Sequence, residues 1–220
     1  MEPNYKQNGN WLGFPEPQYL GHCAFRGLGF YPDGQPFEPK VNYVYGRGLR
    51  AGYVPVSSTK VYWFVCFNSP SPGPKITDPA VLKNEAQKLV RNWPSELLEI
   101  IDRTPDDTII KTPLVDRWLW PKVSPSVSSG GLVLVGDAWH PMTPNLGQGA
   151  RCALEDAVVL SGKLATALDA GPVAIDDALK AYEKERWGRI FPLTIRANLV
   201  GSLLQWENPI VCVVRNNSHS

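Results

Sequence analysis

The stretch GLVLVGDAWHPMTPNLGQGA at residues 131–150 constrains the fold of this sequence more than any other. A short apolar run bounded by turn residues is typical of a buried strand, so we expect a strand at 132–135. Asp137 ends the run, a proline-containing loop follows, and Gly149 comes directly before a helical pattern. In α/β folds a strand, loop and helix in this order places the loop where ligands bind. Asp137 is therefore a candidate ligand-binding carboxylate, the alternative being an aspartate that only caps the turn.

A long helix is predicted after this loop, because apolar residues recur at helical spacing until the sequence AGP at 170–172. Its predicted apolar face consists of Ala150, Ala153, Leu154, Ala157, Val158, Leu164, Ala167 and Leu168. Glu155 and Asp156 are predicted to lie largely off this face, and we interpret them as structural contacts rather than as chemistry. Arg151 leaves two interpretations open, namely support for a bound anion or simple exposure to solvent. A second helix is predicted at about 176–190, and weaker helical character follows it.

The first half of the chain has the pattern of a β-sheet with helices. Residues 21 to 67 are dense in aromatic and β-branched residues with recurring turn signals, which predicts strands. Within them, LRAGYVPVSSTKVYWFVCF at 49–67 predicts two strands joined by a short turn. Asp78 followed by proline predicts a helix start, and Pro94 opens a second short helix. Aromatic strands of this kind favour an antiparallel sheet with one covered face.

Other motifs carry less weight. GRGLRA at 46–51 matches the glycine pattern of a dinucleotide-binding turn, but a β-rich segment follows it instead of a helix. We interpret its glycines as positions where a ligand or another backbone approaches a strand closely. His140 is open to a catalytic interpretation, although we favour a loop histidine that satisfies backbone groups. Neither the histidines nor the cysteines have metal-ligand spacing, so no metal site is predicted and no catalytic residue is assigned.

The composition argues against several functions. A net charge of +1 gives no electrostatic case for binding nucleic acid or an anionic membrane surface. The sequence holds no uninterrupted apolar run of about 18 residues, the length that a membrane-spanning helix needs. The polar start MEPNYKQNGNWLG lacks the apolar segment of a signal peptide, which favours an intracellular, cytoplasmic location.

Residues 131–168, GLVLVGDAWHPMTPNLGQGARCALEDAVVLSGKLATAL, closely resemble the second FAD-binding segment of class A flavoprotein monooxygenases. That family includes zeaxanthin-epoxidase-like and salicylate-hydroxylase-like plant enzymes. The shared pattern is a strand that ends in Gly-Asp, then Pro-x-x-Gly-Gln-Gly, then Glu-Asp-Ala in a helix. In addition, VDRW at 115–118 resembles the family's entry strand. The resemblance implies an α+β fragment of an α/β, Rossmann-like FAD-binding monooxygenase, with an antiparallel substrate-domain sheet and an incomplete FAD domain.

The resemblance also implies roles for particular residues. Asp137 would bind the ribityl hydroxyls of FAD, the loop would pass the flavin ring, and the helix N-terminus would favour the negative charge of reduced flavin. The cofactor-binding residues implied in this way are Gly136, Asp137, Pro144, Leu146, Gly147, Gln148, Gly149 and Ala150. The candidates for the substrate pocket are Tyr45, Gly52, Tyr53 and Trp63.

The expected domain division also follows the family. Residues 1–20 would be a remnant of the N-terminal FAD region, 21–120 the substrate-domain sheet with its helices, 121–172 the second FAD-binding segment, and 173–220 C-terminal helices. Complete members begin with a strand, a GxGxxG turn and a helix that bind the ADP half of FAD. We find no such start here and expect the C-terminal part of a monooxygenase, without tight FAD binding by itself. An alternative transcript, a truncated gene model and a short paralogue all stay open.

The leading functional hypothesis is a FAD-dependent monooxygenase. Such an enzyme would use NAD(P)H and dioxygen to hydroxylate or epoxidise a small organic substrate, and the cofactor would carry the difficult chemistry. The alternative is a non-catalytic fragment or interaction protein, with a partner such as a full-length paralogue.

Overall fold

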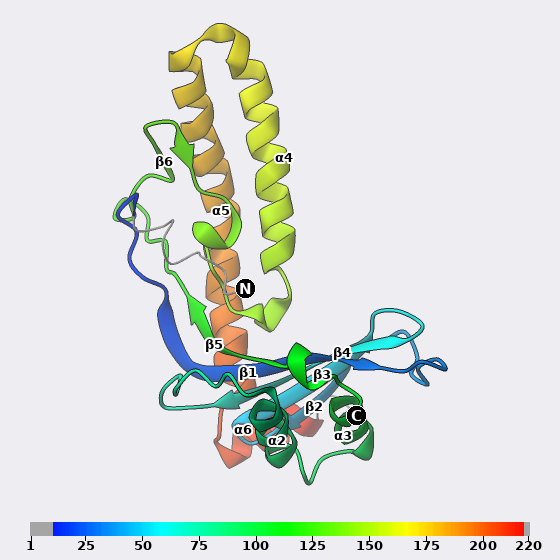
Figure 1. Cartoon of the computed structure of the whole chain (residues 1–220). Helices are drawn as coiled ribbons and strands as arrows, with labels where there is room; N and C mark the ends of the chain where they lie inside the picture. Colours follow the sequence, from blue (N-terminus) through cyan, green and yellow to red (C-terminus); the bar gives the residue numbers. More distant parts are fainter. Residues whose placement is uncertain (1–10, 218–220) are drawn as a thin grey trace. The chain divides into compact units, whose positions relative to one another are not determined.

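The computed structural model describes residues 11–217, apart from the side chains at 169 and 214–217. Residues 1–10, which belong to the predicted segment 1–20, lie outside the described part. The chain divides into two compact units, both drawn in Figure 1. Of the described residues, unit 1 comprises 11–18 and 115–202, and unit 2 comprises 19–114 and 203–217.

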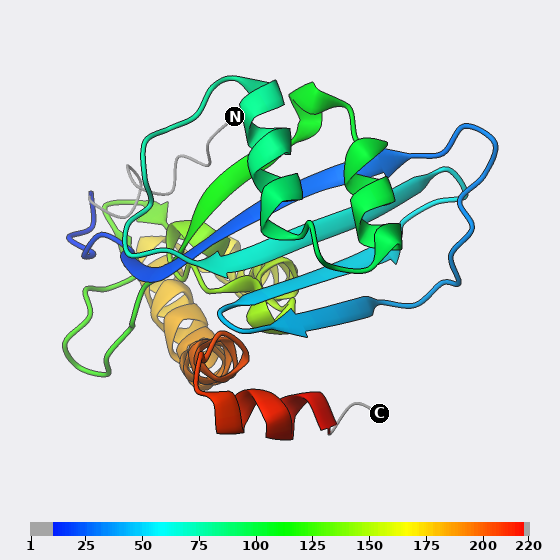
Figure 2. The same cartoon turned by 90° about the horizontal axis from the view of Figure 1, so that it is seen from below.

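Unit 2 is built on a five-stranded sheet with the strand order β2-β3-β4-β1-β5. The strands are β1 (Gln18–Phe30), β2 (Asn42–Gly46), β3 (Leu49–Pro55), β4 (Lys60–Asn68) and β5 (Ile110–Asp116). The pairs β1–β4, β2–β3 and β3–β4 are antiparallel, which confirms the predicted kind of sheet. Two helices, α2 (Pro79–Leu89) and α3 (Ser95–Asp102), cover one face of it (Figure 2). The short helix η1 (Asp106–Thr108) and the C-terminal helix α6 (Pro209–Asn217) complete the unit.

The core of unit 2 lies between the sheet and these helices. Because successive side chains of a strand point to opposite faces, Val61, Trp63 and Val65 of β4 all reach the covered face. They are fully buried together with Leu97 of α3. The indole Nε1 of Trp63 donates a hydrogen bond to Oγ1 of Thr104 at 2.8 Å, so the polar atom of this large core residue is satisfied.

The helix starts of unit 2 follow their sequence signals. The side chain of Asp78 accepts a hydrogen bond from the N–H of Ala80 at 2.9 Å, and Pro79 is the first residue of α2. This is the predicted N-cap arrangement. Helix α3 begins directly after Pro94, also as predicted.

The GRGLRA sequence forms the β2–β3 hairpin, which confirms that it is not a dinucleotide-binding turn. Gly46 ends β2, Leu49 begins β3, and Gly48 between them has a φ of +65°. A Cβ on Gly46 would lie 2.8 Å from the ring of Trp93. The space beside this glycine is therefore filled by a side chain of the same unit.

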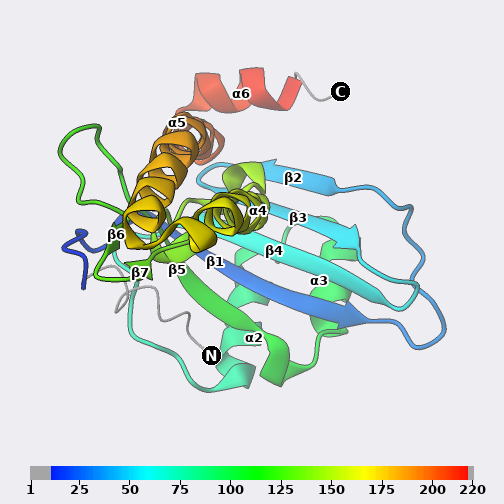
Figure 3. The same cartoon turned by 90° about the horizontal axis from the view of Figure 1, so that it is seen from above.

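Unit 1 contains two long helices, α4 (Gly149–Ala167) and α5 (Pro172–Leu204), joined by the short helix η4 (Leu168–Ala170). They run side by side in Figures 1 and 3, and Lys163 pairs with Glu185 across them at 2.8 Å. Ahead of α4 come the ribbon of β6 (Ser128–Ser129) and β7 (Leu132–Val133) and the short helices η2 (Gly136–Ala138) and η3 (Pro144–Leu146). The core of the unit includes Leu134, Trp139 and Tyr182.

The strand predicted at 132–135 is shorter than expected. Strand β7 ends at Val133, and its one partner among the described residues is β6. The glycines at 130 and 131, both with positive φ, close a tight hairpin between the two strands. The N–H of Leu134 still donates to the carbonyl of Val127 at 3.0 Å. Beyond it the chain turns into η2. The prediction of a strand that runs to Gly-Asp is therefore wrong after Val133.

The predicted apolar face of α4 is confirmed at Ala167, which is buried, but it is wrong at most of its other positions. Leu154 and Val158 are 71% and 72% exposed, whereas Cys152 and Asp156 are buried. The helix turns this other stripe inward because Asp156 pairs with Arg186 of α5 at 2.7 Å. Periodicity detects an apolar stripe, but it does not tell which stripe neighbouring elements cover.

The second helix of unit 1 is much longer than the predicted span 176–190. It extends to Leu204 and contains Pro192. Ile190, Leu193 and Ala197, on both sides of that proline, are buried. Tertiary packing therefore carries the helix through a residue that normally interrupts one.

Candidate functional site

The loop between β7 and α4 begins with a tight turn that a side chain of α4 holds. Gly136 has a φ of +56°, and its N–H donates to Oδ2 of Asp156 at 2.8 Å. A Cβ on Gly136 would lie 3.0 Å from the Cβ of Ala153. Both the backbone conformation and the close approach require glycine here. This predicted cofactor residue therefore has a structural role within the unit.

Asp156 is a fully buried carboxylate that accepts hydrogen bonds from separate segments of the chain. Besides Gly136, it accepts hydrogen bonds from Nε2 of His140 at 2.6 Å and from Nε of Arg186 at 2.7 Å. Burial alone would raise the pKa of Asp156, but the bonds from His140, Arg186 and Gly136 outweigh burial and lower that pKa. Because an ionised carboxylate only accepts, Nε2 of His140 carries the ring proton in this network.

Sequence reasoning missed this buried cluster. His140 contacts a carboxylate, not the backbone groups that we expected it to satisfy, and its Nδ1 is buried without a partner among the described residues. Asp156 was predicted off the buried face, as was Glu155, which pairs with Arg186 at 2.9 Å. Arg186 lies 30 residues from Asp156 in the chain, so no local pattern connects them.

The opposite side of the same loop is held by Arg117, which is 1% exposed. Its Nη1 donates to the carbonyls of Ala138 and Trp139 at 2.7 and 2.9 Å, and its Nε to the carbonyl of Pro15 at 2.8 Å. Its backbone N–H donates to the carbonyl of Pro141 at 3.0 Å. Burial lowers the pKa of this guanidinium, while the charge of Glu16 opposes the shift. The resemblance to the family singled out VDRW but gave Arg117 no role.

Asp137, whose chain neighbours Gly136 and Ala138 are bonded to Asp156 and Arg117, is itself exposed. The surrounding loop desolvates its carboxyl and raises its pKa, and the nearby His140 opposes that shift. A Cβ on Gly149 would lie 3.9 Å from Oδ1 of Asp137, so the first residue of α4 approaches this carboxylate. The structure thus brings together two of the residues that the resemblance assigned to FAD.

The start of α4 has the chemistry of an anion-binding site. Its first turn has no acidic residue, and Gln148 at the N-cap makes no side-chain cap hydrogen bond. Gly147 has a φ of +61° with open space around it, and at Gly149 a Cβ would meet nothing nearer than 3.9 Å. Backbone amides at a helix N-terminus and a glycine with open space beside it suit a flat, electron-rich group such as a flavin ring. The residues present therefore fit the flavin part of FAD.

The other predicted cofactor residues lie on the same stretch of unit 1. Pro144 and Leu146 form the short helix η3, and Nε2 of Gln148 donates to the carbonyl of Leu146 at 3.3 Å. Ala150 is exposed in the first turn of α4. Arg151 is also exposed and pairs with Glu155 at 3.3 Å.

The substrate-pocket candidates lie in unit 2, but on opposite faces of the sheet. Tyr53 pairs with Trp63 in the register of β3 and β4, and both belong to the helix-covered core. Tyr45 and Gly52 lie on the other face, where a Cβ on Gly52 would be 2.7 Å from the ring of Phe64. The four candidates therefore do not share one surface.

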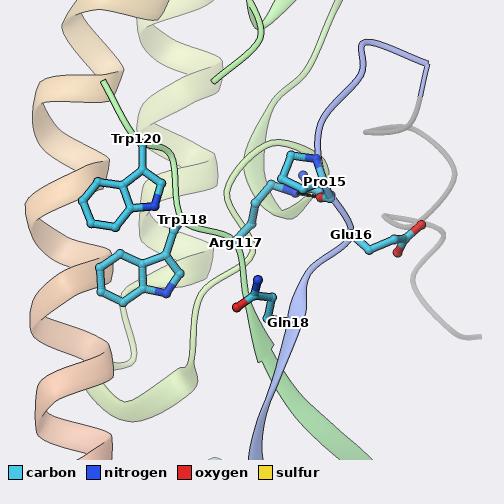
Figure 4. A pocket seen from close by; sticks show the side chains of 6 residues that line it. All are labelled: Pro15, Glu16, Gln18, Arg117, Trp118 and Trp120. Atoms are coloured by element: carbon cyan, nitrogen blue, oxygen red, sulfur yellow. Dashed lines mark hydrogen bonds between the residues drawn. The ribbon is translucent and has the colours of Figure 1, made fainter. Parts of the chain in front are cut away.

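A pocket of about 420 Å³ in unit 1 involves none of the predicted site residues. Its walls are Pro15, Glu16, Gln18, Arg117, Trp118 and Trp120 (Figure 4). The two indoles are stacked at 5.5 Å between ring centroids. The Nη2 atom of Arg117 is buried and has no hydrogen-bond partner among the described residues.

Within residues 11–217, no helix combines the length and the apolar character needed to cross a membrane. In the same part of the chain, no group of His, Cys, Asp and Glu side chains is arranged to hold a metal ion.

The fold and the loop define a class of protein. Residues 48–193 match the family model described as FAD binding domain, and the chain belongs to that family. FAD is the cofactor of this class, and the expected resemblance to flavin-dependent monooxygenases agrees with the names of the relatives below.

Among curated proteins, Monooxygenase 2 of Arabidopsis thaliana is 31% identical, over 93% of this chain and 54% of its own length. The aurachin C monooxygenase/isomerase of Stigmatella aurantiaca is 32% identical, over 91% of this chain and 49% of its own length. The chain therefore spans about half the length of the curated relatives it matches. Among solved structures, Klebsiella pneumoniae HpxO complexed with FAD and uric acid superposes with a TM-score of 0.78 at 24% identity, covering 96% of this chain and 52% of HpxO. This likeness supports the fold.

Proposed function

We propose that this chain supplies the flavin-ring and ribityl contacts of a FAD-dependent monooxygenase, together with its substrate-domain sheet. The enzyme would use NAD(P)H and dioxygen to hydroxylate or epoxidise a small organic substrate. The observation that carries the proposal is the exposed carboxylate of Asp137 beside the start of α4, which has no side-chain cap, with open space at Gly147 and no atom nearer than 3.9 Å to a Cβ built on Gly149. The division at 1–20, 21–120, 121–172 and 173–220 is part of the same proposal.

Each residue of the loop has a defined task in this proposal. Bound FAD would supply the electron transfer and the oxygen chemistry. Asp137 would accept hydrogen bonds from the ribityl hydroxyls, a good match because an ionised oxygen makes charge-assisted bonds. Gly147 and Gly149 would let main-chain amides approach the ring, and the start of α4 would stabilise negative charge at its edge. The remaining predicted contacts are Gly136, Pro144, Leu146, Gln148 and Ala150.

For the substrate, the placement of the candidates favours Tyr45 and Gly52. Their face of the sheet also carries Tyr43, whose ring stacks on Tyr45 at 6.0 Å, and Phe64, 6.1 Å from Tyr43. Flat aromatic side chains around a glycine suit a small aromatic or unsaturated substrate. Trp63 and Tyr53 would act on this face only through the strands that they anchor from the core.

A titration of the purified chain with FAD, followed by amide chemical shifts, tests the proposal. The expected result is perturbation of the amides of Gly147, Gly149 and Ala150, even if the affinity is only millimolar. Asp137→Ala should weaken FAD about 10- to 150-fold, the usual range for a hydrogen bond to a charged group. Asp177→Ala removes an exposed carboxylate of α5 and should leave the affinity unchanged.

Two results would contradict the proposal. One is an absence of any shift in the 136–150 loop at millimolar FAD, which would favour the non-catalytic alternative with a protein partner such as a paralogue. The other is an unchanged affinity in Asp137→Ala, which would remove the ribityl assignment.

A further inference from the structure

We propose that Asp156 and Arg117 are positioning residues that clamp the backbone of residues 136–141 from two sides and thereby aim Asp137. The buried carboxylate holds the N–H side of this loop, and the buried guanidinium holds its carbonyl side. The clamp itself depends only on contacts within unit 1. Its importance for flavin binding rests on the function proposed above.

The anionic side of the clamp is Asp156. Its Oδ2 accepts both the N–H of Gly136 and Nε2 of His140, at 2.8 and 2.6 Å, so a single oxygen fixes both ends of the turn from 136 to 140. The turn is closed internally, because the N–H of His140 donates to the carbonyl of Gly136 at 2.9 Å. Arg186 of α5 neutralises the carboxylate through Oδ1 at 2.7 Å. Helix α5 thus holds the carboxylate of Asp156 through Arg186, and this carboxylate in turn holds the loop.

The cationic side is Arg117. Its Nη1 donates hydrogen bonds to the successive carbonyls of Ala138 and Trp139, and its backbone N–H donates to the carbonyl of Pro141. Its Nε takes the carbonyl of Pro15, which ties the N-terminal segment of unit 1 to the same loop. A planar guanidinium can hold these directions at once, whereas a lysine ammonium is a compact point charge on a flexible stem.

The position of Asp137 follows from the hydrogen bonds that these two residues make to its neighbours. Gly136, the residue before it, is held by Asp156, and Ala138, the residue after it, is held by Arg117. The side chain of Asp137 itself stays exposed. A polar group that projects from an immobilised backbone binds its ligand with less ordering penalty than one on a mobile loop. The clamp therefore pre-organises the carboxylate for a ligand.

Amide hydrogen exchange of the chain without flavin tests the clamp. In Asp156→Asn and in Arg117→Lys, exchange at the amides of Trp139 and His140 should rise about 10- to 150-fold, the range for losing a bond to a charged group. The amide of Cys152, inside α4, should change less than about threefold. Arg189→Met is the matched control, because it removes a guanidinium of α5 whose hydrogen bonds go to Glu155 and not to the loop.

Two exchange results would overturn the clamp. They are unchanged exchange at Trp139 and His140, and an equal rise at Cys152, which would mean that the substitutions merely destabilise the whole unit. If Asp156→Asn does not fold, as circular dichroism would show, His140→Ala takes its place, since it removes one donor and leaves Arg186 paired with Asp156.

FAD affinity, measured on the same variants, separates the clamp from the proposed function. Faster amide exchange in the loop together with an FAD affinity about tenfold weaker supports positioning of Asp137. Faster amide exchange with an unchanged FAD affinity refutes the positioning role. If the parent chain shows no FAD shift in the loop, the proposed function fails, and exchange alone decides whether the clamp exists.

Discussion

Gly136 and Gly147, two glycines of the loop between β7 and α4, share a backbone conformation but not an environment. Alanine should therefore have different effects at the two positions. Gly136 and Gly147 have φ values of +56° and +61°. A Cβ on Gly147 meets nothing within 4 Å, whereas a Cβ on Gly136 meets that of Ala153 at 3.0 Å. Gly147→Ala therefore introduces backbone strain alone, and Gly136→Ala introduces the same strain with a clash.

The magnitudes follow from these two contributions. A left-handed conformation destabilises a residue with a Cβ by roughly 1–2 kcal/mol, so Gly147→Ala should lower the free energy of unfolding by that amount. Overpacking adds typically about 1–3 kcal/mol, because Ala153 lies on a helix and cannot withdraw freely. Gly136→Ala should therefore lower it by about 2–5 kcal/mol.

Urea denaturation followed by circular dichroism and tryptophan fluorescence measures both effects. Gly188→Ala serves as a control of opposite sign, because Gly188 is inside α5 with open space around it, and alanine should stabilise the helix by roughly 0.5–1 kcal/mol. If Gly136→Ala destabilises the protein no more than Gly147→Ala, the contact with Ala153 does not constrain the turn and the reasoning is refuted.

Further predictions concern unit 2. Thr104→Val should lower the free energy of unfolding by about 1–3 kcal/mol, because it leaves the buried Nε1 of Trp63 without its acceptor. Thr108→Val, at an exposed site, is the control. If calorimetry shows that Thr104→Val destabilises the protein no more than Thr108→Val does, the prediction is contradicted. His22 should make stability depend on pH. Burial lowers its pKa below the ordinary 6.5, and the bond to Asn68 only partly opposes this. The unfolded chain then binds the proton first, so stability is full above about pH 6.5 and falls as the pH drops toward the folded pKa. In His22→Gln the urea midpoint of unfolding should no longer fall as the pH drops below about 6.5. If the midpoint still falls over this pH range, a group other than His22 causes the pH dependence.

Features of the sequence that depend on near neighbours were predicted well. The cap at Asp78, the helix start after Pro94, the β3–β4 hairpin and the helix start at Gly149 all appear where the sequence indicated. Each depends on backbone preferences and hydrogen bonds within a few residues, which the sequence states directly. The Gly-Asp and Gly-Gln-Gly pattern likewise sufficed to identify the family.

The tertiary structure alone decided which stripe of α4 is buried and what holds the loop. His140 and Arg186 lie 16 and 30 residues from Asp156 in the chain, and Arg117 lies 21 residues from Ala138. Sequence patterns assign charged residues to the surface, because burying a lone charge is unfavourable. A buried charge becomes tolerable only when partners from distant segments converge on it, and that convergence is a property of the packed fold rather than of any local stretch.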